Sequence, residues 1–349
     1  MPPDEQAVEF EESLVLSPDA VRTGPAVACR PLQYWRFRFT AAAECPAYWQ
    51  VVFTDAAGAD LPGDVCSSID PCAAWTPFSS VVRVPPHACA MKVAFRGMDD
   101  AIRVLKLHDE GRRVRIARWG LEPFSTEAAR EWADRLYGEL PPLIWQPEPG
   151  QRGLESTRAR LQAGGNLCVA LLGASDINDL SHSLWELLVT RARPNVTIEV
   201  HPLIGDRARI HAQLFEADAG AAAAPSRSDL AIVSDGLARE LGADGLVRVG
   251  ERLACELLVI RTMTFPDVRM RNQNDEVAAL AERLAAATPD GAAVAEAGGA
   301  VFFDMRTPFI EYLLASNAPL NGFNRDILHA NDRGRQIAAR FLSEFLTSE

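Results

Sequence analysis

Several features that would indicate an export route, a membrane or a nucleotide ligand are missing from this sequence. Residues 1–12 contain no basic segment followed by an apolar one, so they do not resemble a secretory signal. No apolar run is long enough to span a bilayer. The chain has no Gly-x-Gly-x-x-Gly, and no phosphate-binding lysine follows the Gly-Ala-Ser-Asp turn at 173–176. We therefore expect a cytoplasmic protein with no membrane association and no cofactor.

Positive charge is also in short supply. The chain has 35 Lys and Arg residues against 47 Asp and Glu, a formal net charge of -12 at pH 7. Its isoelectric point is near 5.1. Such a balance argues against nucleic acid as a partner and against binding to an anionic membrane surface, because both would repel the protein.

Paired cysteines are absent as well. The seven cysteines include no Cys-x-x-Cys, and their spacing is irregular. A zinc site could be imagined from Cys66, Cys72, His87 and Cys89, but zinc sites usually contain a closely spaced pair of ligands. We therefore predict no metal site and expect reduced thiols, as is usual for a large cytosolic protein.

At 349 residues the chain is longer than a typical single domain, so we expect two. Residues 30–118 contain short alternating or apolar runs separated by turn-forming Gly, Pro and Asp. The runs are 34–40, 48–54, 81–84, 91–95 and 102–107. This pattern predicts an all-β sandwich or jelly-roll domain over residues 1–145.

The sequence changes character after this region. Residues 125–137 read as a helix capped by Ser125, and the Pro-rich stretch 141–153 reads as a linker that contains the domain boundary. Strands then alternate with helices. The predicted strands are 167–172, 196–200, 230–233, 257–260 and 300–303, and the predicted helices are 180–191, 207–217, 246–253 and 276–287. Residues 146–349 are therefore predicted to form a parallel sheet covered by helices on both faces.

Two motifs in this second region carry chemistry. Asp326 and His329 lie three positions apart just before an amphipathic helix, a spacing that lets a carboxylate orient an imidazole base. Far upstream, an apolar strand ends in Gly173-Ala-Ser175, which puts a serine hydroxyl at the carboxyl edge of the sheet. Either motif alone is more often a structural turn or a helix start. Together, and in this order, they predict a nucleophile and its base.

These residues resemble the SGNH (GDSL-type) hydrolases over about residues 150–349. In that family the first block carries the serine in Gly-Asp-Ser, and the last block is Asp-x-x-His followed by a helix. The resemblance implies a flavodoxin-like, three-layer α/β fold. It also implies a triad in which Ser175 attacks an acyl carbonyl, His329 transfers the proton and Asp326 holds the imidazole.

The resemblance also implies how a negatively charged intermediate would be held. The oxyanion donors would be the N–H groups of Ser175 and of Gly205, although Gly205 reads equally well as a turn glycine. In two places the sequence departs from the family. Ala174 replaces the usual Asp, and Ala238 stands where the oxyanion Asn is expected. Asn178 is a candidate substitute, and a helix-start residue is the alternative.

Candidate substrate contacts are Arg325, beside the base, and Gly236, in the stretch that replaces the third block of the family. An exposed Arg in a loop can also be simply solvated. The aromatic residues of the β region are the other candidates, as platforms on which a sugar ring could stack or as core residues. They are Tyr34, Trp35, Tyr48, Trp49 and Trp75.

Several carbohydrate esterases of the SGNH class carry a β-sandwich ahead of the hydrolase domain, and this chain has the same order. The resemblance therefore implies a serine esterase that removes small acyl groups, acetyl above all, from a small-molecule or glycan ester. Two alternatives stay open. One is an O-acyltransferase that uses the same triad, and the other is a non-catalytic glycan-binding protein on a decayed scaffold. The sequence does not indicate an oligomeric state.

Overall fold

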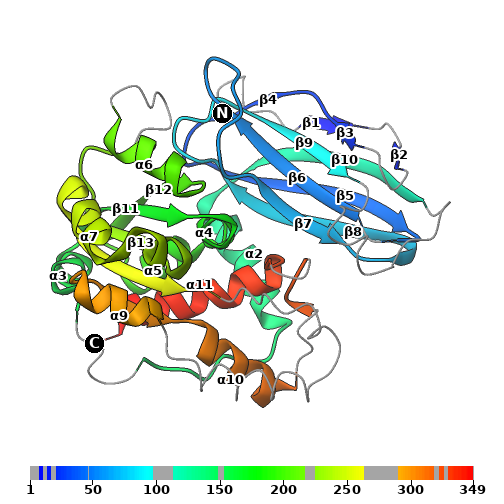
Figure 1. Cartoon of the computed structure of the whole chain (residues 1–349). Coiled ribbons are helices and arrows are strands. Elements are labelled where there is room, and N and C mark those ends of the chain that lie inside the picture. The colour runs from blue at the N-terminus through cyan, green and yellow to red at the C-terminus, as the bar shows by residue number, and fades with distance from the viewer. Residues whose placement is uncertain are drawn as a thin grey trace. The chain divides into compact units, whose positions relative to one another are not determined.

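The computed structural model describes most of the chain, which divides into two compact units, Met1–Trp132 and Ala133–Glu349 (Figure 1). The described residues are 8–10, 14–16, 21–45, 47–96, 113–147, 153–216, 225–262, 290–317, 322–325 and 329–348. No helix in these ranges is both long and apolar enough to cross a bilayer.

The first unit is a sandwich of two antiparallel sheets, as predicted (Figure 1). One sheet has the strand order β1-β10-β5-β8, with β2 also paired to β10, and the other has the order β3-β9-β6-β7, with β4 also paired to β9. The strands are β1 Val8–Phe10, β2 Leu14–Leu16, β3 Val21–Thr23, β4 Val27–Ala28, β5 Tyr34–Ala43, β6 Ala47–Thr54, β7 Val65–Ile69, β8 Cys72–Arg83, β9 Ala90–Arg96 and β10 Val114–Phe124. The predicted strand at 102–107 lies outside the described residues.

Alternation along the strands builds the core of the sandwich. In β5, Trp35, Phe37 and Phe39 are buried while Arg36 and Arg38 between them are not, because successive side chains of a strand point to opposite faces. The rings of Phe37 and Trp49 lie 5.2 Å apart between centroids. Three of the aromatic residues that were candidates for stacking on a sugar are buried and are therefore core residues: Tyr34, Trp35 and Trp49. Trp75, in contrast, is 47% exposed.

The cysteines of this unit do not form a metal-binding group among the residues that the structure describes. Among the described residues no cysteine forms a disulfide, and no group of three or more His, Cys, Asp or Glu could hold a metal ion. Cys29 is buried in the sandwich, and desolvation raises the pKa of its thiol to about 12. Such a thiol is protonated and unreactive at neutral pH.

The boundary between the units falls earlier than expected. It lies inside α2 (Thr126–Gly138), which Ser125 caps by accepting the Ala128 N–H at 3.1 Å, as predicted. The proline-rich residues that follow are not an extended linker up to residue 147, because they pack onto the core of the second unit. The Tyr312 hydroxyl donates to the Pro141 carbonyl at 2.8 Å, and Trp145 stacks on Phe303.

The second unit contains a five-stranded parallel sheet with the order β12-β11-β13-β14-β15 (Figure 1). The strands are β11 Gly165–Gly173, β12 Val196–Ile204, β13 Leu230–Ser234, β14 Glu256–Arg261 and β15 Val301–Asp304. This order is that of a flavodoxin-like doubly wound fold, in which the chain reverses its direction of travel between the first and third strands. The predicted fold class is therefore correct, and the switch point lies between β11 and β13.

Helices cover both faces of this sheet, and β11 shows why. Leu167, Val169 and Leu171 enter one core cluster, whereas Ala170 and Leu172 enter the other. The first cluster also takes residues from α3 (Glu155–Ala163), α4 (Ser175–Ser181), α5 (Trp185–Ala192), α10 (Arg306–Ser316) and α11 (Asp332–Thr347). The second takes residues from α6 (Arg207–Phe215), α7 (Asp235–Leu253) and α9 (Asp290–Ala297).

Several helices differ from the prediction. The single helix expected at 180–191 is two, α4 and α5, and Leu184 between them has a positive φ of 61°. The helix expected at 246–253 begins at Asp235 and bends at Gly242. Helices α3, α9 and α10 are additional. The helix predicted at 276–287 lies outside the described residues.

Candidate active site

Ser175 is the first residue of α4 and follows β11 directly, so it lies at the carboxyl edge of the sheet beside the switch point. Gly173 makes this tight turn possible. A Cβ on Gly173 would lie 2.5 Å from Ile177 Cγ1 and 2.8 Å from Ser234 Oγ, too close for any larger residue. The glycine of the Gly-x-Ser motif therefore lets the end of β11 approach both its own helix and the end of β13.

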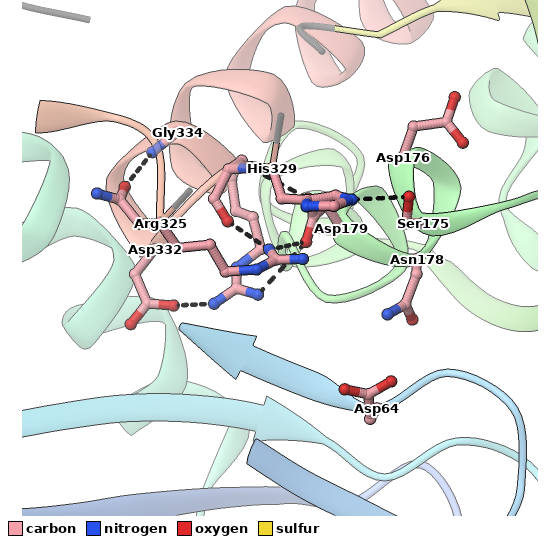
Figure 2. A network of polar contacts seen from close by, with 12 residues as sticks. Asp64, Ser175, Asp176, Asn178, Asp179, Arg325, His329, Asp332 and Gly334 are labelled. Carbon is pink, nitrogen blue, oxygen red and sulfur yellow. Dashed lines mark hydrogen bonds and ion pairs between the residues drawn. The ribbon is translucent and has the colours of Figure 1, made fainter. Parts of the chain in front are cut away.

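The structure brings His329 to this serine. His329 Nε2 lies 2.8 Å from Ser175 Oγ, as the dashed line in Figure 2 shows. This is hydrogen-bond distance, and the hydroxyl donates to Nε2 when the imidazole carries its proton on Nδ1. Ser175 is exposed and His329 is half-buried. Asp326, the predicted orienting acid, lies outside the described residues.

A narrow backbone pairing presents His329. Asn324 and Ala330 form an antiparallel bridge, the Arg325 N–H donates to the His329 carbonyl at 2.9 Å, and the Asn331 N–H donates to the Phe323 carbonyl at 2.9 Å. We call residues 322–325 and 329–331 the base hairpin. Its second arm leads straight into α11.

Asn331 joins the base hairpin to α11. Its side-chain oxygen accepts the Gly334 N–H at 3.0 Å as an N-cap, and its amide nitrogen donates to the Gly322 carbonyl at 3.0 Å. A Cβ on Gly334 would lie 2.3 Å from the Phe323 carbonyl oxygen. The glycine after the Asp-x-x-His motif is therefore needed for the first arm of the hairpin to pass over the start of the helix.

A group of buried and half-buried charges contacts the hairpin, and we call it the Asp179 network: Asp179, Arg325, Asp332 and Arg335. Figure 2 labels the first three of them. Asp179 Oδ1 lies 2.5 Å from Arg325 Nη1 and 3.7 Å from Arg335 Nη1. Asp332 pairs with Arg335 in turn. The Arg325 and Arg335 side chains are only 5% and 3% exposed, so two buried cations face two carboxylates.

The Asp179 network also binds the backbone next to His329. The Ala330 N–H donates to Asp179 Oδ2 at 3.1 Å, and Arg325 Nη1 donates to the Ala330 carbonyl at 2.7 Å. Arg325 is thus buried between α4 and the base hairpin, not exposed at a pocket mouth as a substrate-reading residue would be. Its position differs from the expectation because Asp179, one helical turn after Ser175, supplies a buried counter-charge.

A second group of charges, the Asp235 network, joins strand ends further along the sheet. Asp235 Oδ2 lies 3.2 Å from Arg261 Nε and 3.5 Å from Arg239 Nη2, and Arg261 Nη1 lies 3.5 Å from Asp304 Oδ2. The other carboxylate oxygen of Asp235 is buried and has no hydrogen-bond partner among the residues that the structure describes.

The remaining predicted residues are spread around the serine. The Gly205 N–H donates to the Gly173 carbonyl at 3.0 Å, so this amide is already engaged by backbone. Asn178 is buried in α4, and neither its amide nor the carboxyl of Asp176 is turned toward His329 (Figure 2). Gly236 is exposed in the first turn of α7, whereas Ala238 is fully buried in the core beneath that helix.

Two polar groups, one at each end of α4, have environments that sequence does not reveal. Desolvation raises the pKa of the Asp176 carboxyl, although the Ile177 N–H donates to it at 2.9 Å and the Thr262 hydroxyl lies 3.4 Å away. His182 is buried at the end of α4. The break after α4 turns this part of the chain back into the core.

Sequence reasoning missed Asp179 and Arg335. A signal was available for Arg335, because it lies on the apolar stripe of α11 with Ala338, Ala339 and Leu342, which are also buried. An Arg within such a stripe indicates a buried ion pair. Asp179 likewise lies between the buried Ile177 and Leu180.

No protein-family model matches the sequence, and no curated protein matches it. Solved structures do match. A two-domain esterase active on acetylated mannans has 14% sequence identity and a TM-score of 0.36, over 56% of this chain and 53% of that one, so the match takes in about half of its length. A family two carbohydrate esterase from Clostridium thermocellum in complex with cellohexaose has 8% identity and a TM-score of 0.33, over 95% of this chain and 98% of that one.

A third match is the enzymatically active domain of bacteriophage CBA120 tailspike protein 4, at 15% identity and a TM-score of 0.26, over 34% of this chain and 18% of that one. At these values the function has to be inferred from the geometry of the site.

Proposed function

We propose that this protein is a serine esterase that hydrolyses small O-acyl esters, acetyl esters above all, on a sugar or glycan. The observation that carries the proposal is the 2.8 Å contact between Ser175 Oγ and His329 Nε2 at the carboxyl edge of the sheet. A serine is a weak nucleophile until a base within hydrogen-bond reach takes its proton. The proposal is supported by this reach and by the position of the two side chains at the edge where doubly wound folds bind ligands.

The reaction follows from the two side chains. Ser175 Oγ attacks the acyl carbonyl carbon while His329 Nε2 takes the hydroxyl proton. The tetrahedral intermediate collapses, the C–O bond to the sugar breaks, and His329 returns the proton to the leaving alcohol. Water then attacks the acyl-serine with His329 again as the base, which releases the carboxylic acid and restores the serine. Asp326 would hold the imidazole in position, by resemblance to the SGNH family.

The N–H of Ser175, in the first turn of α4, is our primary oxyanion donor, because the first N–H groups of a helix have no partner within it. The Gly205 N–H donates to the Gly173 carbonyl. To act as an oxyanion donor as well, it would have to leave this carbonyl or divide its hydrogen bond between the carbonyl and the oxyanion. The Asn178 amide would have to turn toward the serine. Removing one oxyanion donor typically lowers kcat by about 100-fold or more, so the absence of an Asn at 238 predicts a slow enzyme unless another group substitutes.

The sugar or glycan part of the proposal is supported by domain order, since a β-sandwich precedes the α/β unit here as in several carbohydrate esterases of the SGNH class. The choice of an acyl group of acetyl size follows the same resemblance. Arg325 is no longer part of the proposed substrate site, because its guanidinium is buried.

The proposal is tested with p-nitrophenyl acetate and with acetylated glycans, comparing wild type with Ser175→Ala and His329→Ala. We expect turnover by wild type and its loss in both variants. Turnover that survives both substitutions would overturn the assignment of the pair. Adding an acceptor alcohol separates the alternatives, because an acyltransferase would form a new ester faster than free acid. A glycan-binding protein without catalysis would retain glycans and leave Ser175 unlabelled by a fluorophosphonate.

A further inference from the structure

We infer that Asp179 and Arg325 are positioning residues that set the distance between Ser175 and His329. The inference rests on the proposed function, and it adds residues that the SGNH resemblance does not supply. It starts from the helix α4, which begins at Ser175. Asp179 lies four residues later on the same helix, so the two side chains are one turn apart on one face.

Asp179 reaches the other half of the site through the backbone. Its Oδ2 accepts the N–H of Ala330, the residue directly after His329, at 3.1 Å. The helix that carries the nucleophile therefore holds the hairpin that carries the base, and one carboxylate makes the connection. Figure 2 shows this arrangement, with Asp179 behind the His329 to Ser175 contact.

Arg325 completes the connection from the opposite arm of the base hairpin. Its Nη1 contacts Asp179 Oδ1 at 2.5 Å and the Ala330 carbonyl at 2.7 Å. Both polar groups of the Ala330 residue are thus bound, its N–H by Asp179 and its C=O by Arg325. With the Arg325 N–H on the His329 carbonyl at 2.9 Å, the peptide that joins His329 to Ala330 is held at both its carbonyl and its N–H.

The location of these charges argues for positioning over substrate binding. The side chain of Asp179 is 10% exposed and that of Arg325 is 5% exposed, so neither group is available to a glycan. Arg335 and Asp332 balance the remaining charge at the start of α11. A buried ion pair is a weak source of net stability, but its directional bonds fix a geometry well.

The test compares three variants of the full chain. Asp179→Asn keeps the size of the side chain and removes its charge, and Arg325→Lys keeps the charge but lacks the fork that reaches Asp179 and Ala330 together. The matched control is Arg333→Gln. Arg333 is another arginine at the start of α11, but its side chain is 48% exposed. Its ion pair with the exposed Glu139 is a long one on the surface, with Nη2 3.7 Å from Oε2. We expect the control to behave like wild type.

For Asp179→Asn we expect kcat for p-nitrophenyl acetate to fall about 100-fold with KM changed less than about threefold, because a displaced base weakens the transition state and not the bound substrate. Phosphonylation of Ser175 by a fluorophosphonate should slow by a similar factor. For Arg325→Lys, both kcat and the rate of phosphonylation should lie between those of Asp179→Asn and wild type. Rates are expressed per folded active site, measured well below each melting temperature, so a loss of folded protein does not count as a loss of geometry.

Hydrogen–deuterium exchange of peptides spanning 324–335 gives a readout that does not need catalysis. The Ala330 amide should exchange at least about tenfold faster in Asp179→Asn than in Arg333→Gln. The inference is overturned if both Asp179→Asn and Arg325→Lys keep kcat within threefold of wild type, or if exchange at Ala330 is unchanged. Failure of the proposed function looks different: wild type then shows no turnover and no labelling of Ser175, while the exchange experiment still decides whether Asp179 holds the hairpin.

Discussion

On the helix that follows β11, Asp179 binds a backbone N–H and two buried arginines, whereas on the helix that follows β13, Asp235 binds only arginine side chains. The two networks use the same chemistry. The first connects the helix of Ser175 to the loop of His329, and the second connects the ends of β13, β14 and β15. We therefore expect a buried ion pair to affect function through the backbone that it binds, and not through its charge alone.

The two networks also differ in how many oxygens of the central carboxylate have a hydrogen-bond partner. In the Asp179 network both carboxylate oxygens have partners, while Asp235 keeps one buried oxygen without a hydrogen bond among the described residues. A fully bonded network fixes one geometry, and a partly bonded one tolerates more movement. We therefore expect substitutions in the first network to change catalysis and stability together, and substitutions in the second to change stability alone.

The largest expected effect is that of Asp179→Asn. It leaves two buried arginines with a single remaining carboxylate, and removing one partner of a buried pair costs about 3–5 kcal/mol of unfolding free energy. Denaturant unfolding measures this loss beside the roughly 100-fold fall in kcat. An unfolding free energy within about 1 kcal/mol of wild type would show that water replaces the lost charge, because an exposed pair contributes no more than this.

Gly334→Ala should have the next largest effect. The new Cβ would lie 2.3 Å from the Phe323 carbonyl, so the base hairpin must move away from α11. Overpacking of this kind typically costs about 1–3 kcal/mol. Because the hairpin carries His329, we expect kcat to fall by about tenfold too, since small misplacements of a base are costly. The matched control is Gly138→Ala, at an exposed helix position where a Cβ would meet nothing within 4 Å.

Asp235→Asn isolates the second network. It should lower the unfolding free energy by about 1–3 kcal/mol, the penalty for leaving buried polar groups unsatisfied, and leave kcat within about threefold of wild type. Parallel measurements of unfolding and of p-nitrophenyl acetate turnover check this. A kcat that falls as far as in Asp179→Asn would erase the distinction between the two networks.

The smallest effect is expected at Asp176, beside the serine but outside both networks. Burial raises the pKa of this carboxyl, so between its unfolded and folded pKa values the folded state binds more protons than the unfolded one. Its contribution to stability therefore falls as pH rises through that window and stays unfavourable above it. Asp176→Asn should stabilise the protein at neutral pH, and the gain should vanish toward pH values below about 4, where an unfolded Asp is protonated.

Thermal unfolding of wild type and Asp176→Asn across pH measures this contribution. A stabilisation that is equal at acidic and neutral pH would show that the change acts through packing and not through the charge.

The sequence predicted the parts of this molecule that depend on local pattern. Alternation along residues 34–40 predicted a strand of the sandwich, and the apolar run before Gly173 predicted the first strand of the parallel sheet. Ser175 and His329 could be paired because two short motifs were each recognisable. Their roles in catalysis stay a prediction, and so does that of Asp326.

What the sequence did not predict depends on contacts between distant segments. Asp179 and Arg325 are 146 positions apart, and neither position has a local signal for the other. Residues 141–147 have the composition of a linker, but Leu143 and Trp145 pack against the hydrophobic core of the second unit. Burial of Arg325 likewise requires knowledge of which helix lies beside it.

We propose that Ser175 and His329 act as nucleophile and base, and their reaction with an activated phosphonate can be followed directly. The most direct measurement is fluorophosphonate labelling followed by peptide mass spectrometry, on wild type, Ser175→Ala and His329→Ala. We predict a single phosphonylated site at Ser175 in wild type, no label in Ser175→Ala, and labelling slowed by about a thousandfold or more in His329→Ala. Wild-type protein that stays unlabelled, a label that remains in Ser175→Ala, or labelling of His329→Ala at the wild-type rate would show that the pair does not act in this way.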